Sequence, residues 1–236
     1  MNCPNCRGAM TALTLDGHQG RPVAIDLCHP CQAFWFDSYE SLRLAPSSVL
    51  HLFQTIGERV GTATRPLSDR SACPSCGMRL IPARDQQRQT KFEYLRCPQR
   101  HGRLISFFNF LREKDFVRPL SAAQLAELRK NVQSVNCSNC GAPVDLAKGS
   151  ACAHCGSPLS MLDLGQAEAL VATLREAGKP SAGVDPTLPL ALARAKRDVA
   201  PAFAAFEQEP DWFDHASNSG LVGAALSSLS RWLSRS

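Results

Sequence analysis

Pairs of cysteines separated by two residues recur along the 236-residue chain, and they constrain its fold more than any other feature. Such pairs face each other in the first 31 residues and again between residues 137 and 155, and in the middle one pair faces a C-x-x-x-H sequence. Two facing pairs are typical of a tetrahedral zinc site. We therefore predict three sites, whose ligands are Cys3, Cys6, Cys28 and Cys31; Cys73, Cys76, Cys97 and His101; and Cys137, Cys140, Cys152 and Cys155.

The middle site takes its fourth ligand from a histidine. The eleven cysteines leave one site a ligand short, and His101 follows Cys97 at C-x-x-x-H spacing, so we expect His101 to complete that site. The alternative is that His101 is a solvated loop residue and that the middle site is open.

Eleven cysteines could also form disulfides, as in secreted domains. The N-terminus favours zinc instead, because Met1 and Asn2 lead straight into Cys3 without the charged and apolar regions of a signal peptide. The odd cysteine count suits disulfides poorly, and no apolar run reaches the roughly 18 residues that predict a membrane span. We therefore expect three zinc ions in a protein of the reducing cytoplasm, with iron in a four-cysteine site as the minor alternative.

The predicted fold follows from the small apolar core that each segment can form. A module of about 30–45 residues holds too small a core to fold without metal or disulfides. We expect a small metal-stabilised α+β protein of three tandem zinc ribbons (short antiparallel β-hairpins), joined by short helices and followed by an amphipathic helix, rather than one large core. The predicted segments are ribbon 1 (1–45), a helix and linker (46–69), a basic ribbon 2 (70–118), a helix (119–133), ribbon 3 (134–162), a helix (163–178), an Ala/Pro-rich linker and helix (179–215) and the amphipathic C-terminal helix (216–236).

Ribbon 1 has the clearest strand pattern. Residues 10–15 and 22–27 alternate apolar and polar side chains, and 16–20 supply a hairpin turn between them. Such a small hairpin needs a large side chain to cover one face, and we expect Trp35 to do so.

The sequences C-P-N-C, I-D-L-C-x-x-C and W-F-D-x-x-E in residues 3–42 resemble the bacterial transcription-factor-type zinc finger, a ribbon similar to that of transcription factor IIB. The resemblance implies the ligands Cys3, Cys6, Cys28 and Cys31, and the family name implies transcription. The chain departs from the family pattern at Ala33, where glycine is frequent, and at Ser41, where leucine is common.

Several elements outside ribbon 1 can also be predicted. Residues 47–60 have the apolar spacing of an amphipathic helix, and 104–111 are expected to form a strand. Ser121 and Gln124 form a capping box at the start of a helix over 121–132. In ribbon 3, C-G-A-P and C-G-S-P are near-copies that resemble double-knuckle zinc ribbons, and their glycines, Gly141 and Gly156, are expected at positive φ.

The formal charge of +5 is concentrated in ribbon 2, where residues 70–118 hold eleven Lys or Arg and four Asp or Glu. Cations alternating with Phe92 and Tyr94 suit nucleic acid, because cations neutralise phosphate and exposed rings stack on bases. Equally, the rings could form the ribbon's own core and the arginines could serve solubility. The candidate nucleic-acid-binding residues are Arg79, Arg84, Arg88, Lys91, Arg96, Arg100 and Arg103.

The C-terminal segment is amphipathic, with apolar side chains gathered on one side of a helix that begins at residue 221. This face could dock on the chain itself, fill a groove on a partner protein or lie on a membrane surface. Its candidate contact residues are Leu221, Val222, Leu226, Leu229, Trp232 and Leu233.

These patterns favour a structural role for the metals. Sites with four cysteines, or with three cysteines and a histidine, fill every coordination position from the protein, whereas catalytic zinc keeps one position open. No Ser/His/Asp arrangement and no phosphate-binding loop is found in the sequence. The leading hypothesis is a non-enzymatic zinc protein that acts as a protein-interaction or regulatory module. Nucleic-acid binding through ribbon 2 is the alternative, and a zinc–thiolate redox switch is a third interpretation.

Overall fold

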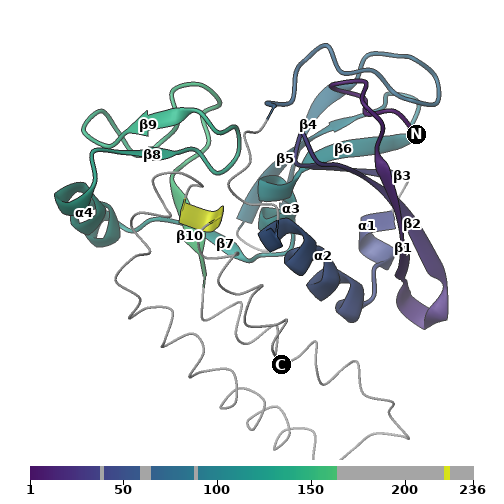
Figure 1. The fold of residues 1–236 in the computed structure, drawn as a ribbon, viewed down its shortest axis with the longest axis horizontal. Coiled ribbons are helices and arrows are strands. Elements are labelled where there is room, and N and C mark those ends of the chain that lie inside the picture. Colours follow the sequence, from purple (N-terminus) through teal and green to yellow (C-terminus); the bar gives the residue numbers. More distant parts are fainter. Residues whose placement is uncertain (38–39, 59–64, 88–89, 164–220, 224–236) are drawn as a thin grey trace, which may run out of the picture.

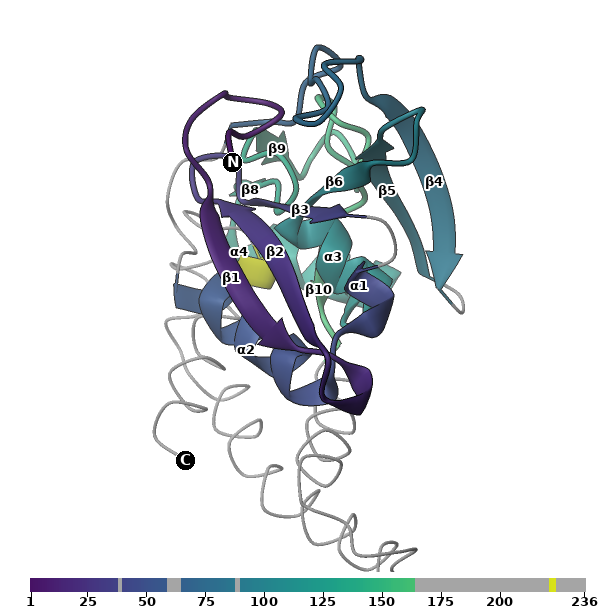
Figure 2. The same ribbon diagram turned by 90° about the vertical axis from the view of Figure 1, so that its right-hand side faces the viewer.

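The first two ribbons share one antiparallel β-sheet (Figures 1 and 2). In this computed structural model, residues 1–37, 40–58, 65–87, 90–163 and 221–223 are described. The six strands are β1 (Thr11–Asp16), β2 (Pro22–Cys28), β3 (Ala33–Asp37), β4 (Ile81–Gln87), β5 (Thr90–Arg96) and β6 (Gly102–Ser106). Their order is β1-β2-β3-β6-β5-β4, so each ribbon supplies three consecutive strands and the second triplet mirrors the first.

The two triplets meet where β3 pairs with β6. Phe34 lies opposite Ile105 and Trp35 lies opposite Leu104 across this antiparallel pair. All four side chains are buried. Ribbons 1 and 2 therefore bury a common core along a shared strand pair, where the sequence predicted small modules rather than one large core.

Helices cover one face of this sheet. They are α1 (Glu40–Arg43), α2 (Pro46–Glu58) and α3 (Phe107–Glu113), of which α2 occupies most of the helix predicted over 47–60. Phe34 and Phe36 alternate with Trp35 and so point to the helical face. There they pack with Phe110 at ring-centroid distances of 5.2 and 5.8 Å, inside a core cluster that also includes residues of α2.

The predicted strand over 104–111 is wrong in its second half. The strand ends at Ser106, whose Oγ accepts a hydrogen bond of 3.2 Å from the Asn109 backbone N–H and caps α3. The apolar residues of 104–111 follow neither the period of a strand nor that of a helix, so their pattern alone could not place this boundary. The turn of the chain at Ser106 brings Phe107 and Phe110 back over the sheet.

The other face of the sheet carries Trp35, which is 1% exposed. It packs in a cluster with Leu104 and with cysteines from both of the first two predicted sites, as expected of a large covering side chain. Its Nε1–H donates to Asp37 Oδ1 at 2.8 Å, and the Asp37 N–H donates to Glu40 Oε2 at 2.8 Å. These two bonds give the W-F-D-x-x-E sequence a local function: they fix the indole and the chain that follows it.

Gly102 shows how closely the indole fits. A Cβ at this position would lie 2.6 Å from Cζ2 of Trp35 and 2.5 Å from the Phe36 carbonyl oxygen. No side chain fits in that space, so only glycine allows β6 to approach β3 at this end.

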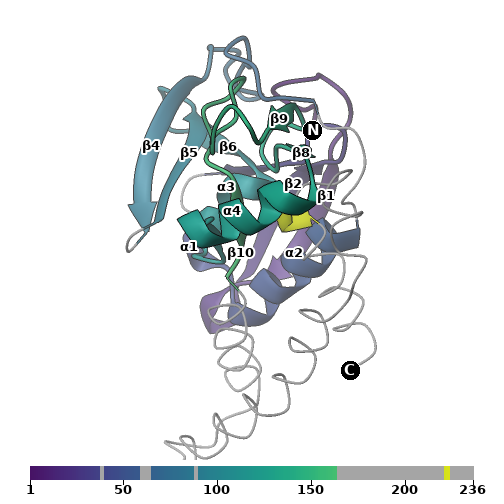
Figure 3. The same cartoon turned by 90° about the vertical axis from the view of Figure 1, so that its left-hand side faces the viewer.

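Ribbon 3 forms a smaller unit beside the sheet (Figures 1 and 3). It contains the strand pair β8 (Ser134–Asn136) and β9 (Pro143–Asp145) and follows α4 (Ala122–Asn131). The predicted capping box of Ser121 and Gln124 is present at the start of α4. A further pair, β7 (Val117–Pro119) with β10 (Ser160–Leu162), ties the end of ribbon 3 to the chain that leaves ribbon 2.

Residues 221–223 lie between ribbon 3 and the sheet (Figure 3). Leu221 is buried in the cluster that contains the ribbon 3 cysteines, whereas Val222 is buried in the core under the sheet. Two residues of the predicted apolar face therefore dock on the chain itself. The other four, Leu226, Leu229, Trp232 and Leu233, lie outside the described residues. So do the helix predicted over 163–178, apart from its first residue, and the linker and helix predicted over 179–215. None of the helices in the described part of the chain has the length and apolarity that a membrane span requires.

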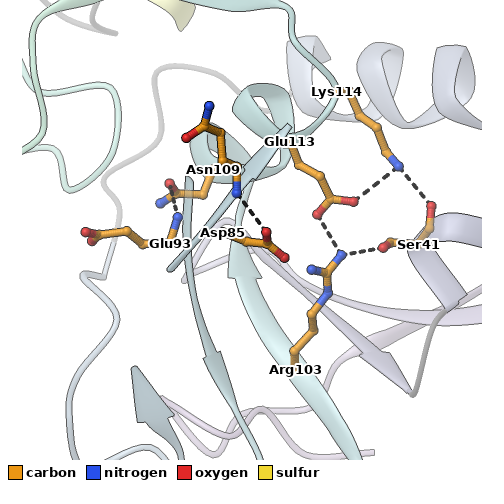
Figure 4. Close-up of polar contacts among 8 residues, drawn as sticks. Ser41, Asp85, Glu93, Arg103, Asn109, Glu113 and Lys114 are labelled. Atoms are coloured by element: carbon orange, nitrogen blue, oxygen red, sulfur yellow. Dashed lines mark hydrogen bonds and ion pairs between the residues drawn. The ribbon is translucent and has the colours of Figure 1, made fainter. Parts of the chain in front are cut away.

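A buried charged cluster joins α3 to β6 and α1 (Figure 4). Glu113, 5% exposed at its side chain, accepts from Arg103 at 2.6 Å and pairs with Lys114 at 3.2 Å. Arg103 also donates to the Ser41 hydroxyl, and Lys114 donates to the Ser41 carbonyl at 2.8 Å. Burial lowers the pKa of Lys114, and its contact with Glu113 opposes this change. The cluster holds the helical layer in register with the sheet.

Replacing Glu113 tests this role. Glu113→Ala leaves two cations in a buried site without their carboxylate, so we expect the free energy of unfolding to fall by about 3–5 kcal/mol. Urea denaturation of the metal-loaded protein measures it. The matched control is Glu93→Ala, which removes the exposed pair with Arg84 and should cost at most about 1 kcal/mol. Equal losses in the two variants would contradict a special role for the buried cluster.

Candidate metal centres

The structure brings the twelve predicted ligands together in three groups of four. Within each group, the ligand atoms all lie within 4.8 Å of one another. His101 joins Cys73, Cys76 and Cys97, and its Nδ1 is the atom that faces the sulfurs. The solvated-loop alternative for His101 therefore does not hold.

The ligand distances fit a tetrahedral cation. A Zn–S bond of about 2.3 Å places two sulfurs of a tetrahedron roughly 3.8 Å apart. The Sγ–Sγ distances are 3.9 and 3.6 Å in the first group and 3.6 and 3.7 Å in the third. In the second group, one Sγ–Sγ distance is 3.6 Å and the two from Sγ to His101 Nδ1 are 3.8 and 3.7 Å. All the cysteines are free, and these sulfur separations far exceed the disulfide bond length of about 2.05 Å.

One turn geometry presents the first cysteine of most pairs. In ribbon 3, the N–H of Gly141 donates to the Cys137 carbonyl and the Cys137 N–H donates to the Ala142 carbonyl, both at 2.8 Å. The same pair of bonds recurs at Cys3, Cys73 and Cys152. The predicted positive φ is present at Gly141 (74°) and Gly156 (71°), as this turn requires.

The three groups differ in how far they are exposed. In the first and third groups, three of the four ligand residues are buried and the fourth is partly buried. In the second group, both Cys76 and His101 are exposed. A chelator can therefore reach the second site more easily than the other two.

The thiols of the third group share their protons in the absence of a cation. A hydrogen bond from Cys137 lowers the pKa of Cys155 to about 4, and the same contact, with burial, raises the pKa of Cys137. A bound cation replaces the remaining protons, so metal binding at this site releases protons and weakens as the pH falls.

An asparagine stands before the second cysteine in the first pair of both the first and the third group. Asn5 Nδ2 donates to Cys31 Sγ at 3.3 Å and to the Pro66 carbonyl at 3.0 Å. Its Oδ1 accepts from the Ser68 N–H at 2.8 Å and from the Ser71 hydroxyl at 3.1 Å. Asn5 therefore connects a ligand of site 1 to the segment that leads into ribbon 2.

Asn139 makes the corresponding contacts in ribbon 3. Its Nδ2 donates to Cys155 Sγ at 3.7 Å and to Ser157 Oγ at 3.0 Å. Its Oδ1 accepts from Ser106 Oγ at 2.8 Å and from Asn109 Nδ2 at 3.3 Å. Through these bonds, the third site is linked to the N-terminus of α3, and ribbon 3 is held against the sheet.

Sequence reasoning missed both asparagines. Side chains between the two cysteines of a pair usually face solvent, so neither position gave a signal by itself. The available signal was the repetition of Asn before the second cysteine in C-P-N-C and C-S-N-C, together with the absence of Asn from C-P-S-C in ribbon 2.

The candidate nucleic-acid residues are not one free surface. Arg103 is tied to the buried Glu113, Arg79 pairs with Asp69 and Arg84 pairs with Glu93. Lys91, Arg96 and Arg100 are exposed, and Arg88 lies outside the described residues.

The two aromatic residues proposed to stack on bases belong to the protein's own core. Phe92 is buried, and the Tyr94 ring is partly buried, with the Arg103 guanidinium carbon 4.9 Å from its centroid. The expectation of an exposed stacking ring is therefore wrong for Phe92, and the Tyr94 ring is exposed only in part.

Comparison with models of protein families gives no match to this chain, and neither does comparison with curated proteins or with solved structures. The resemblance of residues 3–42 to a transcription-factor-type zinc finger therefore stays a prediction.

The exposure of the second group predicts the order of metal loss. When the fully loaded protein is mixed with a chromophoric chelator, we expect one metal equivalent to leave before the other two, from Cys76 and His101. Cys76→Ser should abolish this fast phase, whereas Cys6→Ser, which alters the partly buried ligand of site 1, should leave it in place. A fast phase that persists in Cys76→Ser would show that another site is the accessible one.

The contacts of Asn139 predict a second outcome. Asn139→Ala leaves buried donors and acceptors unpaired, so we expect the free energy of unfolding to fall by about 1–3 kcal/mol. Hydrogen exchange should rise at residues 106–109 and 155–158. Asn5→Ala should instead raise exchange at residues 66–71, and the exposed Asn2→Ala should change neither region. Unchanged exchange at 106–109 in Asn139→Ala would contradict the link between site 3 and α3.

Proposed function

We propose that the protein is a non-enzymatic zinc protein, in which three structural Zn²⁺ ions stabilise a scaffold that binds a protein partner. The observation that carries this proposal is that each ligand group has four protein ligands at tetrahedral spacing. Zn²⁺ suits groups of four cysteines, or of three cysteines and a histidine, by softness and geometry. Bound there, it would crosslink the turns that present the ligands and would supply a fixed framework.

The position of the ligand groups supports a structural role. Ligands of sites 1 and 2 pack in one cluster with Trp35 and Leu104, and ligands of site 3 lie in the cluster that contains Leu221. Four thiolates also leave a four-cysteine zinc centre with a charge of about −2, which makes it a poor Lewis acid. The metals therefore serve the fold rather than a reaction.

The β4–β5 hairpin is the element best placed to meet a partner. It forms one end of the sheet (Figure 2), and six of the seven residues of β4 are exposed. In the described part of the chain, β4 has β5 as its one neighbouring strand, so its other edge pairs with no described strand. The Pro82 ring removes one backbone donor from this strand, which limits non-specific strand pairing.

Cobalt substitution tests the closed coordination. We expect three Co²⁺ per chain with the absorption of tetrahedral thiolate sites, and we expect added azide to leave that spectrum unchanged because no position is open. A ligand-induced change would indicate an exchangeable position and would favour a catalytic site.

Partner binding needs its own experiment. We expect the immobilised metal-loaded chain to retain a specific protein from a cell extract, and the metal-stripped chain to lose it because the framework no longer holds. Elemental analysis of both samples should report about three zinc ions and none, respectively. Retention of the same protein by the metal-stripped chain would contradict a zinc-dependent scaffold.

A further inference from the structure

A cleft of about 750 Å³ lies between the β4–β5 hairpin and ribbon 3. One wall is formed by residues 84–86 and 91–93 of the hairpin, and the other by the turn at residues 155–158. Arg112 of α3 lies between them. The cleft is large enough for a short peptide segment and is open to solvent.

Hydrogen bonds fix both walls of this cleft. The Glu93 N–H donates to Asn109 Oδ1 at 3.0 Å, which holds β5 against α3 (Figure 4). Asn109 Nδ2 donates to Asn139 Oδ1 at 3.3 Å, and Asn139 in turn binds Cys155 and Ser157. A continuous polar chain therefore sets the distance between the hairpin and the third metal site. The cleft is part of the folded framework rather than a gap between independent units.

Some of the charged side chains that line the cleft have a polar partner within the described part of the protein and others do not. Arg84 pairs with Glu93 at 2.8 Å, and Asp85 Oδ1 accepts from the Gln86 N–H at 2.8 Å. Among the residues that the structure describes, neither Lys91 nor Arg112 forms an ion pair with a carboxylate. The cleft therefore presents two cations that an anionic ligand could neutralise.

Arg112 is the more constrained of the two. Its guanidinium carbon lies 5.7 Å from the centroid of the buried Phe108 ring, and the side chain is partly buried. Burial lowers its pKa, and the charge of Glu93 opposes this change. A ring face offsets part of the lost hydration of a cation, and a carboxylate in the cleft would offset more.

We propose that this cleft binds an extended acidic segment of the partner protein, with carboxylates of that segment on Arg112 and Lys91. The inference rests on the proposed scaffold function, for which it names the contact surface and the chemistry of the partner.

Peptide carboxylates suit this surface better than the phosphates of a nucleic acid. Asp85 and Glu93 line the same cleft, so a regularly charged phosphate backbone would meet two carboxylates there. A peptide can place neutral residues opposite these two acids. Phe92, the aromatic residue of the cleft, is 4% exposed and offers no ring face for base stacking.

Fluorescence anisotropy with defined probes tests the proposal on the metal-loaded full-length chain. The probes are a labelled Glu/Ser peptide, a Gln/Ser peptide of equal length and a single-stranded oligothymidylate. We expect the Glu/Ser peptide to bind, the Gln/Ser peptide not to bind, and the affinity for the Glu/Ser peptide to fall as salt is added.

Variants locate the binding. Lys91→Gln and Arg112→Gln should each lower the affinity for the Glu/Ser peptide by about tenfold. The control is Arg21→Gln, which removes an exposed cation at the far end of the sheet and should leave this affinity unchanged. Asp85→Asn removes a repulsive charge and should strengthen binding, which loss of folding cannot imitate. Lys91 is exposed, so its variant stays informative even if Arg112→Gln destabilises the protein.

The possible outcomes separate this inference from the proposed function. Absence of Glu/Ser peptide binding, or equal weakening by Arg21→Gln, would overturn the cleft assignment. Tighter binding of the oligothymidylate that is lost in Lys91→Gln would overturn it in favour of nucleic acid. If the cleft variants still retain the protein partner in the capture experiment, the scaffold function stands and the cleft assignment fails. If the peptide binds as expected but the metal-stripped chain retains the partner equally well, the zinc-dependent scaffold fails.

Discussion

The pairing of β3 with β6 is the interaction on which the rest of the structure depends. It joins the first two ribbons into one sheet, and it places Trp35 opposite Leu104 beside the cysteines of two ligand groups. The other face of the same strands packs against α2 and α3. A single strand pair therefore makes a two-layer core out of hairpins that are each too small to bury one.

Metal bound at these groups would therefore stabilise the same residues as apolar burial. The turns that hold the ligands of sites 1 and 2 are fixed beneath Trp35, and those of site 3 pack around Leu221. The two asparagines extend this relation to the polar contacts, because each joins one ligand sulfur to a neighbouring segment of the chain. A change at one of these ligand groups should consequently alter the contacts between neighbouring structural units as well as those within one ribbon.

The parts of the structure that depend on local sequence were predictable. The spacing of the cysteine pairs predicts the three ligand groups. The alternation of apolar and polar residues predicts β1 and β2, and the capping box of Ser121 and Gln124 predicts the start of α4. These features depend on residues a few positions apart, or on ligand types with a strong geometric preference. The ligand role of His101 could be predicted for the same reason, because His101 follows Cys97 at the spacing of a ligand pair.

The remaining features depend on contacts between distant residues. Both β3 and β6 are rich in apolar residues, but nothing in their sequences predicts that these two strands pair with each other. The run at 104–111 could not reveal that Ser106 would cap a helix, because the cap depends on where the chain meets the sheet. Phe92 and Tyr94 alternate with cations in a way that also fits an exposed face. Only the packing of α3 beside β5 shows that Phe92 is buried and Tyr94 is partly buried.

The mirrored strand order has a consequence for the isolated halves. Two equivalent triplets that meet through β3 and β6 are arranged like the subunits of a two-fold dimer contained within one polypeptide. Either half alone would present its third strand as an open apolar edge, the kind of surface that recruits a second copy. Covalent linkage converts this self-association into an intramolecular step, so the sheet forms at any protein concentration. The two halves also need not have the same sequence, so each can carry a different surface charge.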